Sequence, residues 1–133
     1  MLKKAALLFG VVFLAIGVLG FLPFLQFGET AGGAPLLLGL FAVNAIHNII
    51  HLASGAAALA ASSSTSYARL YFKIFGVVYA LVTVLGFLSG GVLLGILPIN
   101  LFDNILHLVI AAASLYLGFG YKGHEAKETK ATA

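Results

Sequence analysis

Four long apolar runs divide the sequence, and they constrain the fold more than any other feature. They lie at 5–25, 42–61, 70–88 and 100–120. Each has roughly the 20 residues that an α-helix needs to cross a hydrocarbon core of about 30 Å. Only 8% of the residues are charged, and the mean hydropathy of +1.12 is typical of membrane proteins rather than soluble domains. The sequence therefore predicts an all-α membrane protein with four transmembrane helices.

The basic residues predict how these helices are oriented. All seven lie before the first run, around the connection between the second and third, or after the fourth: Lys3, Lys4, Arg69, Lys73, Lys122, Lys127 and Lys130. The positive-inside rule makes this side cytoplasmic. We therefore expect both termini in the cytoplasm. The protein itself is expected in the inner (plasma) membrane or another energy-transducing membrane. The basic residues form no patch interleaved with aromatic residues, which argues against nucleic acid as a partner.

The chain divides into a membrane domain and a tail. We expect a four-helix transmembrane domain over 1–121. Residues 122–133 are polar and charged and have no apolar face, which predicts a disordered cytoplasmic tail. His124 belongs to that tail and is expected to be a solvated side chain.

The sequence also contains an internal repeat. FGVVFLAIGVLGFL at 9–22 matches FGVVYALVTVLGFL at 75–88, and LLGLFAVNAIHNIIHL at 37–52 matches LLGILPINLFDNILHL at 93–108. Such self-similarity predicts two copies of one structural unit. Each unit, 5–62 and 69–120, contains two helices, so both have the same orientation. We expect them to be related by a pseudo-twofold axis along the membrane normal.

A polar motif occurs once in each repeat, inside a helix that is otherwise apolar. Its spacings of three, four and seven residues place the polar side chains on one helical face, and we expect both faces to turn inward. The repeat aligns Asn44 with Asn100, His47 with Asp103, Asn48 with Asn104 and His51 with His107.

The motif combines residues with different expected roles. Asn44 and Asn100 are placed to cap the second and fourth helices, and Asp103 is placed to complete a capping box. His51 and His107 lie about 10 Å deeper, seven residues at 1.5 Å each. Ionisable residues at that depth face the bundle interior and usually serve a function. Alternatively, neutral histidines hydrogen-bond to Asn or Ser and join the repeats, with Asn48 and Asn104 in the same structural cluster.

Three functional alternatives remain open for this motif. His47, His51, Asp103 and His107 offer four ligands for a divalent metal such as Zn, Mn or Fe. His51 and His107 could instead be axial ligands of a haem or another pigment. A proton or ion path is the third alternative. The chain has no cysteine, and it contains no G-x-S-x-G, P-loop, H-E-x-x-H or dinucleotide-binding motif.

The motif pair also indicates a family. GLFAVNAIHNIIHLASG with GILPINLFDNILHL, preceded by FGVVYALVTVLGF, resembles the bacterial membrane family catalogued as domain of unknown function 4383. The resemblance covers nearly the whole chain apart from the tail. It implies a small multi-span membrane protein, and it implies no reaction, substrate or cofactor.

Our first interpretation is a non-catalytic accessory or structural subunit without a cofactor. Its Asn/His/Asp cluster would join the two repeats. Its partners would be the lipid bilayer and other membrane subunits or further copies of the chain. The alternative is a membrane protein that binds haem, pigment or metal through His51 and His107, with His47 and Asp103 in support.

Overall fold

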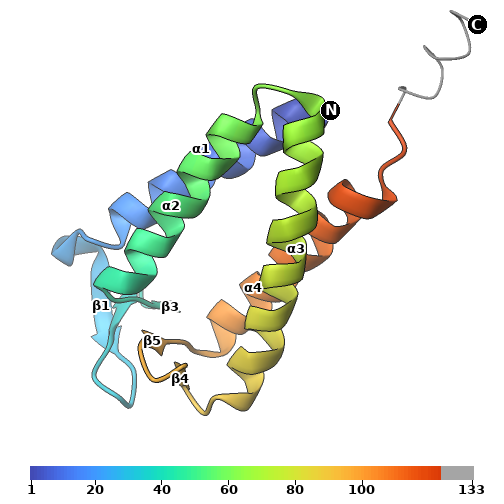
Figure 1. Ribbon diagram of the computed structural model, residues 1–133. Helices are drawn as coiled ribbons and strands as arrows, with labels where there is room; N and C mark the ends of the chain where they lie inside the picture. Colours follow the sequence, from blue (N-terminus) through green and yellow to red (C-terminus); the bar gives the residue numbers. More distant parts are fainter. Residues whose placement is uncertain (124–133) are drawn as a thin grey trace, which may run out of the picture.

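A computed structural model describes residues 1–123, which form four α-helices with short strands at one end (Figure 1). Most of the predicted tail, including His124, lies outside the described residues. The helices are α1 (Leu2–Leu19), α2 (Ala45–Ala61), α3 (Thr65–Leu88) and α4 (Leu101–Leu115), and a π-helical turn (Tyr116–Gly120) continues α4. The strands are β1 (Gln26–Glu29), β2 (Pro35–Leu37), β3 (Phe41–Ala42), β4 (Val92–Leu93) and β5 (Leu97–Pro98).

Three of these helices are long and apolar enough to cross a membrane. They are α1, α3 and α4 together with its π-helical turn, and α2 is a shorter apolar helix of 17 residues. The prediction of four helices is thus confirmed, with three of them long enough to span a membrane, although the first helix ends at Leu19 and not at residue 25. Leu22 is extended, because the ring of the following Pro23 disfavours helical backbone at that position.

The two outer connections contain antiparallel strands that the sequence patterns did not predict. β1, β2 and β3 form one small sheet, and β4 and β5 form a hairpin. Leu36 pairs with Ala42, and Val92 pairs with Pro98. In both turns a leucine and then a glycine adopt positive φ, Leu38 with Gly39 and Leu94 with Gly95, as in the tight turns that favour β-hairpins.

The helices pack in two close pairs, α1 with α2 and α3 with α4 (Figure 1). Glycines allow the backbones to approach. A Cβ atom on Gly55 would lie 2.8 Å from the backbone nitrogen of Leu14, and one on Gly76 would lie 2.8 Å from that of Leu115. Such contacts between small residues are typical of helices that associate in lipid.

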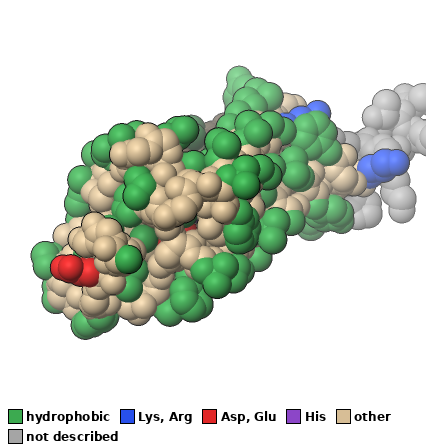
Figure 2. Space-filling model, turned by 90° about the horizontal axis from the view of Figure 1, so that it is seen from below, with side chains coloured by type: hydrophobic (Ala, Val, Ile, Leu, Met, Phe, Trp, Pro, Cys, Tyr) green, Lys and Arg blue, Asp and Glu red, His purple; other side chains and the backbone are tan. Residues whose placement is uncertain are grey.

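The interior is aromatic, and the outer surface is apolar. Phe13, Phe75 and Tyr79 form a buried cluster with Ala111, and the rings of Phe13 and Phe75 meet edge to face at 5.2 Å. Large hydrophobic side chains also cover much of the outside, and Lys and Arg side chains gather toward one end (Figure 2). An exposed apolar surface of this extent fits contact with lipid.

Candidate functional site

Asparagine caps hold the starts of α2 and α4. The Asn44 side-chain oxygen accepts the His47 backbone N–H at 2.8 Å, and the Asn100 oxygen accepts that of Asp103 at 3.0 Å. In α4 the Asp103 carboxylate accepts the Asn100 backbone N–H at 2.9 Å, which completes the capping box predicted from the sequence. Both histidine-bearing helices therefore begin at fixed positions.

The same capping residues tie the two halves of the chain together. The amide nitrogen of Asn44 donates to the Ile96 carbonyl at 2.8 Å, and that of Asn100 donates to the Leu40 carbonyl at 2.6 Å. Each asparagine thus reaches the turn that precedes the other helix. Asp103 adds a third link, because its Oδ2 also accepts the Ala42 backbone N–H at 3.0 Å.

Asn48 and Asn104 pack against glycines instead of joining the histidines. A Cβ atom on Gly20 would overlap the Asn48 amide, and one on Gly86 would overlap that of Asn104. The Oδ1 atoms of both asparagines are buried and have no hydrogen-bond partner within residues 1–123. Their amides therefore occupy the α1–α2 and α3–α4 contacts.

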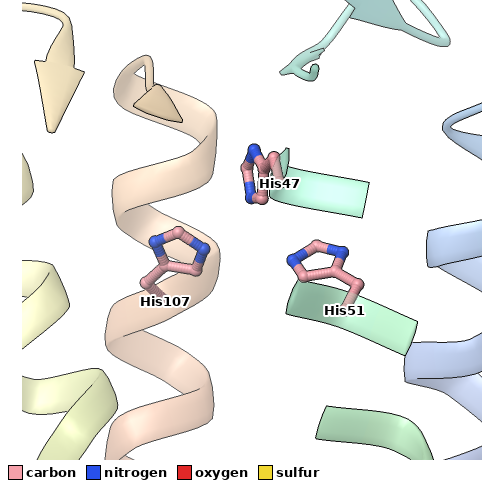
Figure 3. Close-up of side chains that lie close together, drawn as sticks. All are labelled: His47, His51 and His107. Atoms are coloured by element: carbon pink, nitrogen blue, oxygen red, sulfur yellow. The ribbon is translucent and has the colours of Figure 1, made fainter. Parts of the chain in front are cut away.

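His47, His51 and His107 point toward one another in the space between α2 and α4 (Figure 3). The two residues on α2 lie one turn apart, with ring centroids separated by 4.7 Å. The centroids of the His47 and His107 rings are 6.1 Å apart. One nitrogen of each of these rings lies within 4.8 Å of the other two. We call this group the histidine triad.

The triad is buried, and its Nδ1 atoms are not satisfied by the surrounding chain. The exposed fraction is 5% for His47, 8% for His51 and 5% for His107. None of the three Nδ1 atoms has a hydrogen-bond partner in the described part of the chain. Each unsatisfied buried polar group costs about 1–3 kcal/mol. The three rings converge, and each has a nitrogen without a partner among the described residues.

Asp103 lies outside the triad, although its spacing in the sequence predicted a fourth ligand. Its Oδ2 accepts two backbone N–H groups, which hold the carboxylate in the cap. It does border a small cavity of about 100 Å³ together with the three histidines.

Aromatic rings and a larger cavity surround the triad. Phe13 meets the His51 ring edge to face at 5.4 Å, and Tyr79 meets the His107 ring at 5.3 Å. On the side of α2 and α3 the triad borders a cavity of about 580 Å³. The polar motif does not predict this cavity, although the small residues Ala53, Ser54 and Ala57 on α2 are a sequence signal for it.

The triad suits a transition-metal ion. Zinc binds imidazole nitrogen at about 2.0–2.1 Å, so tetrahedral ligand atoms lie about 3.3 Å apart. The ring nitrogens are separated by up to 4.8 Å, so they would have to close by up to about 1.5 Å to bind such an ion. Three protein ligands leave a fourth position open, as in metal centres that bind a further molecule.

Three helices long and apolar enough to span a membrane, together with the exposed hydrophobic surface, indicate a helical protein of the integral membrane class. Within that class the chain belongs to the family described as a domain of unknown function, DUF4383, whose sequence model matches residues 3–120. The resemblance seen in the sequence is thereby confirmed. No curated protein and no solved structure matches the chain.

Proposed function

We propose that this membrane protein binds one divalent transition-metal ion between α2 and α4, through His47, His51 and His107. The observation that carries the proposal is the convergence of three buried imidazoles whose Nδ1 atoms have no partner within the described residues. Imidazole suits zinc, copper, iron and nickel, so the donor set fits a first-row divalent ion. Zinc is the ion we expect, because three histidines and an open position are a common zinc arrangement.

The geometry favours a metal ion over a haem or another pigment. An axial pair formed by His51 and His107 would require a flat macrocycle between their rings. The His47 ring lies 4.7 Å from the His51 ring and 6.1 Å from the His107 ring. It therefore fills space that the macrocycle would need, whereas a metal ion uses that same ring as a ligand.

A structural role is the second candidate function, and we assign it to the asparagines and Asp103. The reciprocal bonds from Asn44 to Ile96 and from Asn100 to Leu40 support this role. In this proposal the capping residues join the two halves of the chain, and the histidine triad binds the ion. An accessory subunit of a larger membrane assembly fits the apolar outer surface.

We also propose that 5–62 and 69–120 are tandem repeats related by a pseudo-twofold axis. Matching features support this relation. The pairing of Leu36 with Ala42 corresponds, in the aligned sequences, to that of Val92 with Pro98. The aligned residues Leu38 and Leu94 both have positive φ, at 55° and 51°.

The decisive experiment measures metal on the purified protein. The full chain, produced with an affinity tag that contains no histidine, is extracted in mild detergent and analysed by elemental mass spectrometry after dialysis against zinc. We expect about one zinc ion per chain, and at least a tenfold loss of affinity in His51→Ala and His107→Gln, since each removes one of three ligands. His124→Ala is the matched control and should retain the ion.

Two outcomes would overturn the metal proposal. The first is a folded wild-type protein that holds no zinc, copper, iron or nickel after dialysis against each ion. The second is stoichiometric metal that survives both triad substitutions. A visible absorption spectrum taken before dialysis tests the alternative, because a Soret band that disappears in His51→Ala would assign the histidines to haem.

A further inference from the structure

The larger cavity beside the triad is a groove between α2 and α3. These two helices diverge from their connection toward the β4–β5 hairpin (Figure 1). The groove has a volume of about 580 Å³, within the range of small-molecule sites. The three histidines lie at its buried side. Its rim includes Ile74 and Val78, which are exposed on the lipid-facing surface of α3.

The groove is present in one half of the molecule and nearly closed in the other. Between α4 and α1, where the aligned sequences place the equivalent space, the cavity holds only about 100 Å³. The reason lies in two positions of the aligned helices. Ala53 and Ser54 border the groove on α2, and α4 has Val109 and Ile110 at the matching positions. Ile110 occupies space between α4 and α1, where it packs against the cluster of Phe13, Phe75 and Tyr79.

One wall of the groove is a row of aromatic rings that leads to the triad. Tyr71, Phe75 and Tyr79 lie on successive turns of α3. The Tyr71 and Phe75 rings are stacked at 4.8 Å, and the Phe75 and Tyr79 rings lie 4.3 Å apart. Tyr79 then meets the ring of His107. Because these rings stack on one another, they present edges to the groove, and a flat ligand ring can meet such edges with its face.

We propose that this groove binds a lipid-soluble molecule of the quinone class. Its ring lies against the Tyr71–Phe75–Tyr79 wall, and one ring oxygen takes the open position on the triad's metal ion. Its alkyl tail leaves between Ile74 and Val78 into the lipid. This inference rests on the proposed metal site, since the ion is what holds the ring oxygen.

The chemistry of the groove selects this occupant in two ways. Nearly all of its wall is apolar and its rim faces lipid, so the occupant must dissolve in the bilayer. The wall ends at a divalent ion bound by imidazoles, and the open position on such an ion takes an oxygen ligand such as a carbonyl or hydroxyl group. A quinone or quinol presents both a flat conjugated ring and ring oxygens, whereas the acyl chain of a phospholipid presents neither.

The test is native mass spectrometry of the full-length protein in detergent, because it counts bound metal and bound ligand on the same molecule. Zinc-loaded protein is titrated with decylubiquinone, and 1-decanol provides the same tail without the ring. We expect one quinone per chain and no comparable adduct with the alcohol. Ser54→Ile, which copies the closed side, should weaken quinone binding about tenfold or more while leaving zinc at one per chain.

The control substitution is Ala56→Ile, on the exposed surface of α2 and away from the groove. It should leave both zinc and quinone unchanged. Ala53→Val provides a second groove variant if Ser54→Ile does not fold, and it should also weaken the quinone.

The outcomes separate this inference from the metal proposal. Zinc without saturable quinone binding overturns the quinone proposal and leaves the metal site intact. The quinone proposal also fails if Ser54→Ile and Ala53→Val bind the quinone as tightly as wild type, or if 1-decanol or a copurified phospholipid occupies the groove in its place. Protein that binds neither zinc nor any other ion overturns the metal proposal, and the quinone proposal fails with it.

Discussion

At the scale of single residues, the aligned positions His47 and Asp103 have different surroundings. The His47 ring turns toward His51 and His107, whereas the Asp103 carboxylate accepts the backbone N–H groups of Asn100 and Ala42. A carboxylate bound by two N–H donors is held in place by charge-assisted hydrogen bonds. The aligned positions therefore hold the proposed metal ligand His47 in one half and the capping residue Asp103 in the other.

This separation predicts opposite results for two alanine substitutions. Asp103→Ala leaves one buried and one partly buried N–H group without an acceptor, so we expect a loss of about 2–4 kcal/mol of stability and unchanged zinc binding. His47→Ala should lower zinc affinity at least tenfold and change the stability of the metal-free protein much less. Unfolding in denaturing detergent and zinc titration measure the two effects. Zinc loss in Asp103→Ala at unchanged stability would contradict this assignment.

At the scale of the helices, glycines set the distance between paired backbones. A Cβ atom on Gly55 would lie 2.8 Å from the Leu14 backbone nitrogen and 2.9 Å from the Gly10 carbonyl oxygen. Both atoms belong to α1, so neither can move without the whole helix. The close approach of α1 to α2 depends on this residue, which lies one turn beyond His51.

We expect Gly55→Ala to destabilise the protein by about 1–3 kcal/mol, because the added methyl group forces α1 and α2 apart. Gly32→Ala is the matched control. Its Cβ would meet only the Thr30 hydroxyl at 3.9 Å, so stability should change by less than about 0.5 kcal/mol. Thermal unfolding followed by circular dichroism measures both. Equal unfolding temperatures for the two variants would show that the α1–α2 contact at Gly55 does not limit the stability of the protein.

The sequence predicted the helices well, because apolar runs of membrane length leave few other structures. Their ends were harder to place, since α1 ends at Leu19, three residues before the extended Leu22 that precedes Pro23. The short strands follow from backbone turns at Leu38 and Leu94, and two-residue strands are too short for an alternating pattern.

The candidate site was predicted in part. The spacing of His47 and His51 on one helix indicated a shared face, and the repeat indicated that His107 would lie opposite. The position of the Asp103 carboxylate depends on a hydrogen bond from Ala42, which is distant in the chain. No local spacing encodes such a contact. The groove depends on how far α2 and α3 diverge, which is also a property of the packed molecule.

At the scale of the whole molecule, the basic residues among those described lie toward one end and the strands lie toward the other (Figures 1 and 2). This arrangement supports the proposed orientation, in which both termini and the α2–α3 connection face the cytoplasm. The β-strands would then face the outside of the plasma membrane.

Cysteine labelling tests this orientation directly, because the native chain contains no cysteine. Ala31→Cys lies in the exposed β1–β2 connection, and Ser63→Cys lies in the exposed α2–α3 connection. A maleimide that does not cross membranes should label Ala31→Cys in intact cells and should label Ser63→Cys only after permeabilisation. The reverse pattern would invert the proposed topology.

The reciprocal bonds of Asn44 and Asn100 have the form of a contact between two identical subunits, in which each partner offers the other the same donor and the same acceptor. In a dimer of two identical chains, both sides of the molecule would carry the same residues and therefore the same cavity. Covalent linkage of the halves removes that requirement. One side can keep Ile110 and stay closed while the other, with Ser54, opens toward lipid. A single polypeptide can thus combine the stability of a symmetric pair with a binding site that symmetry alone would duplicate.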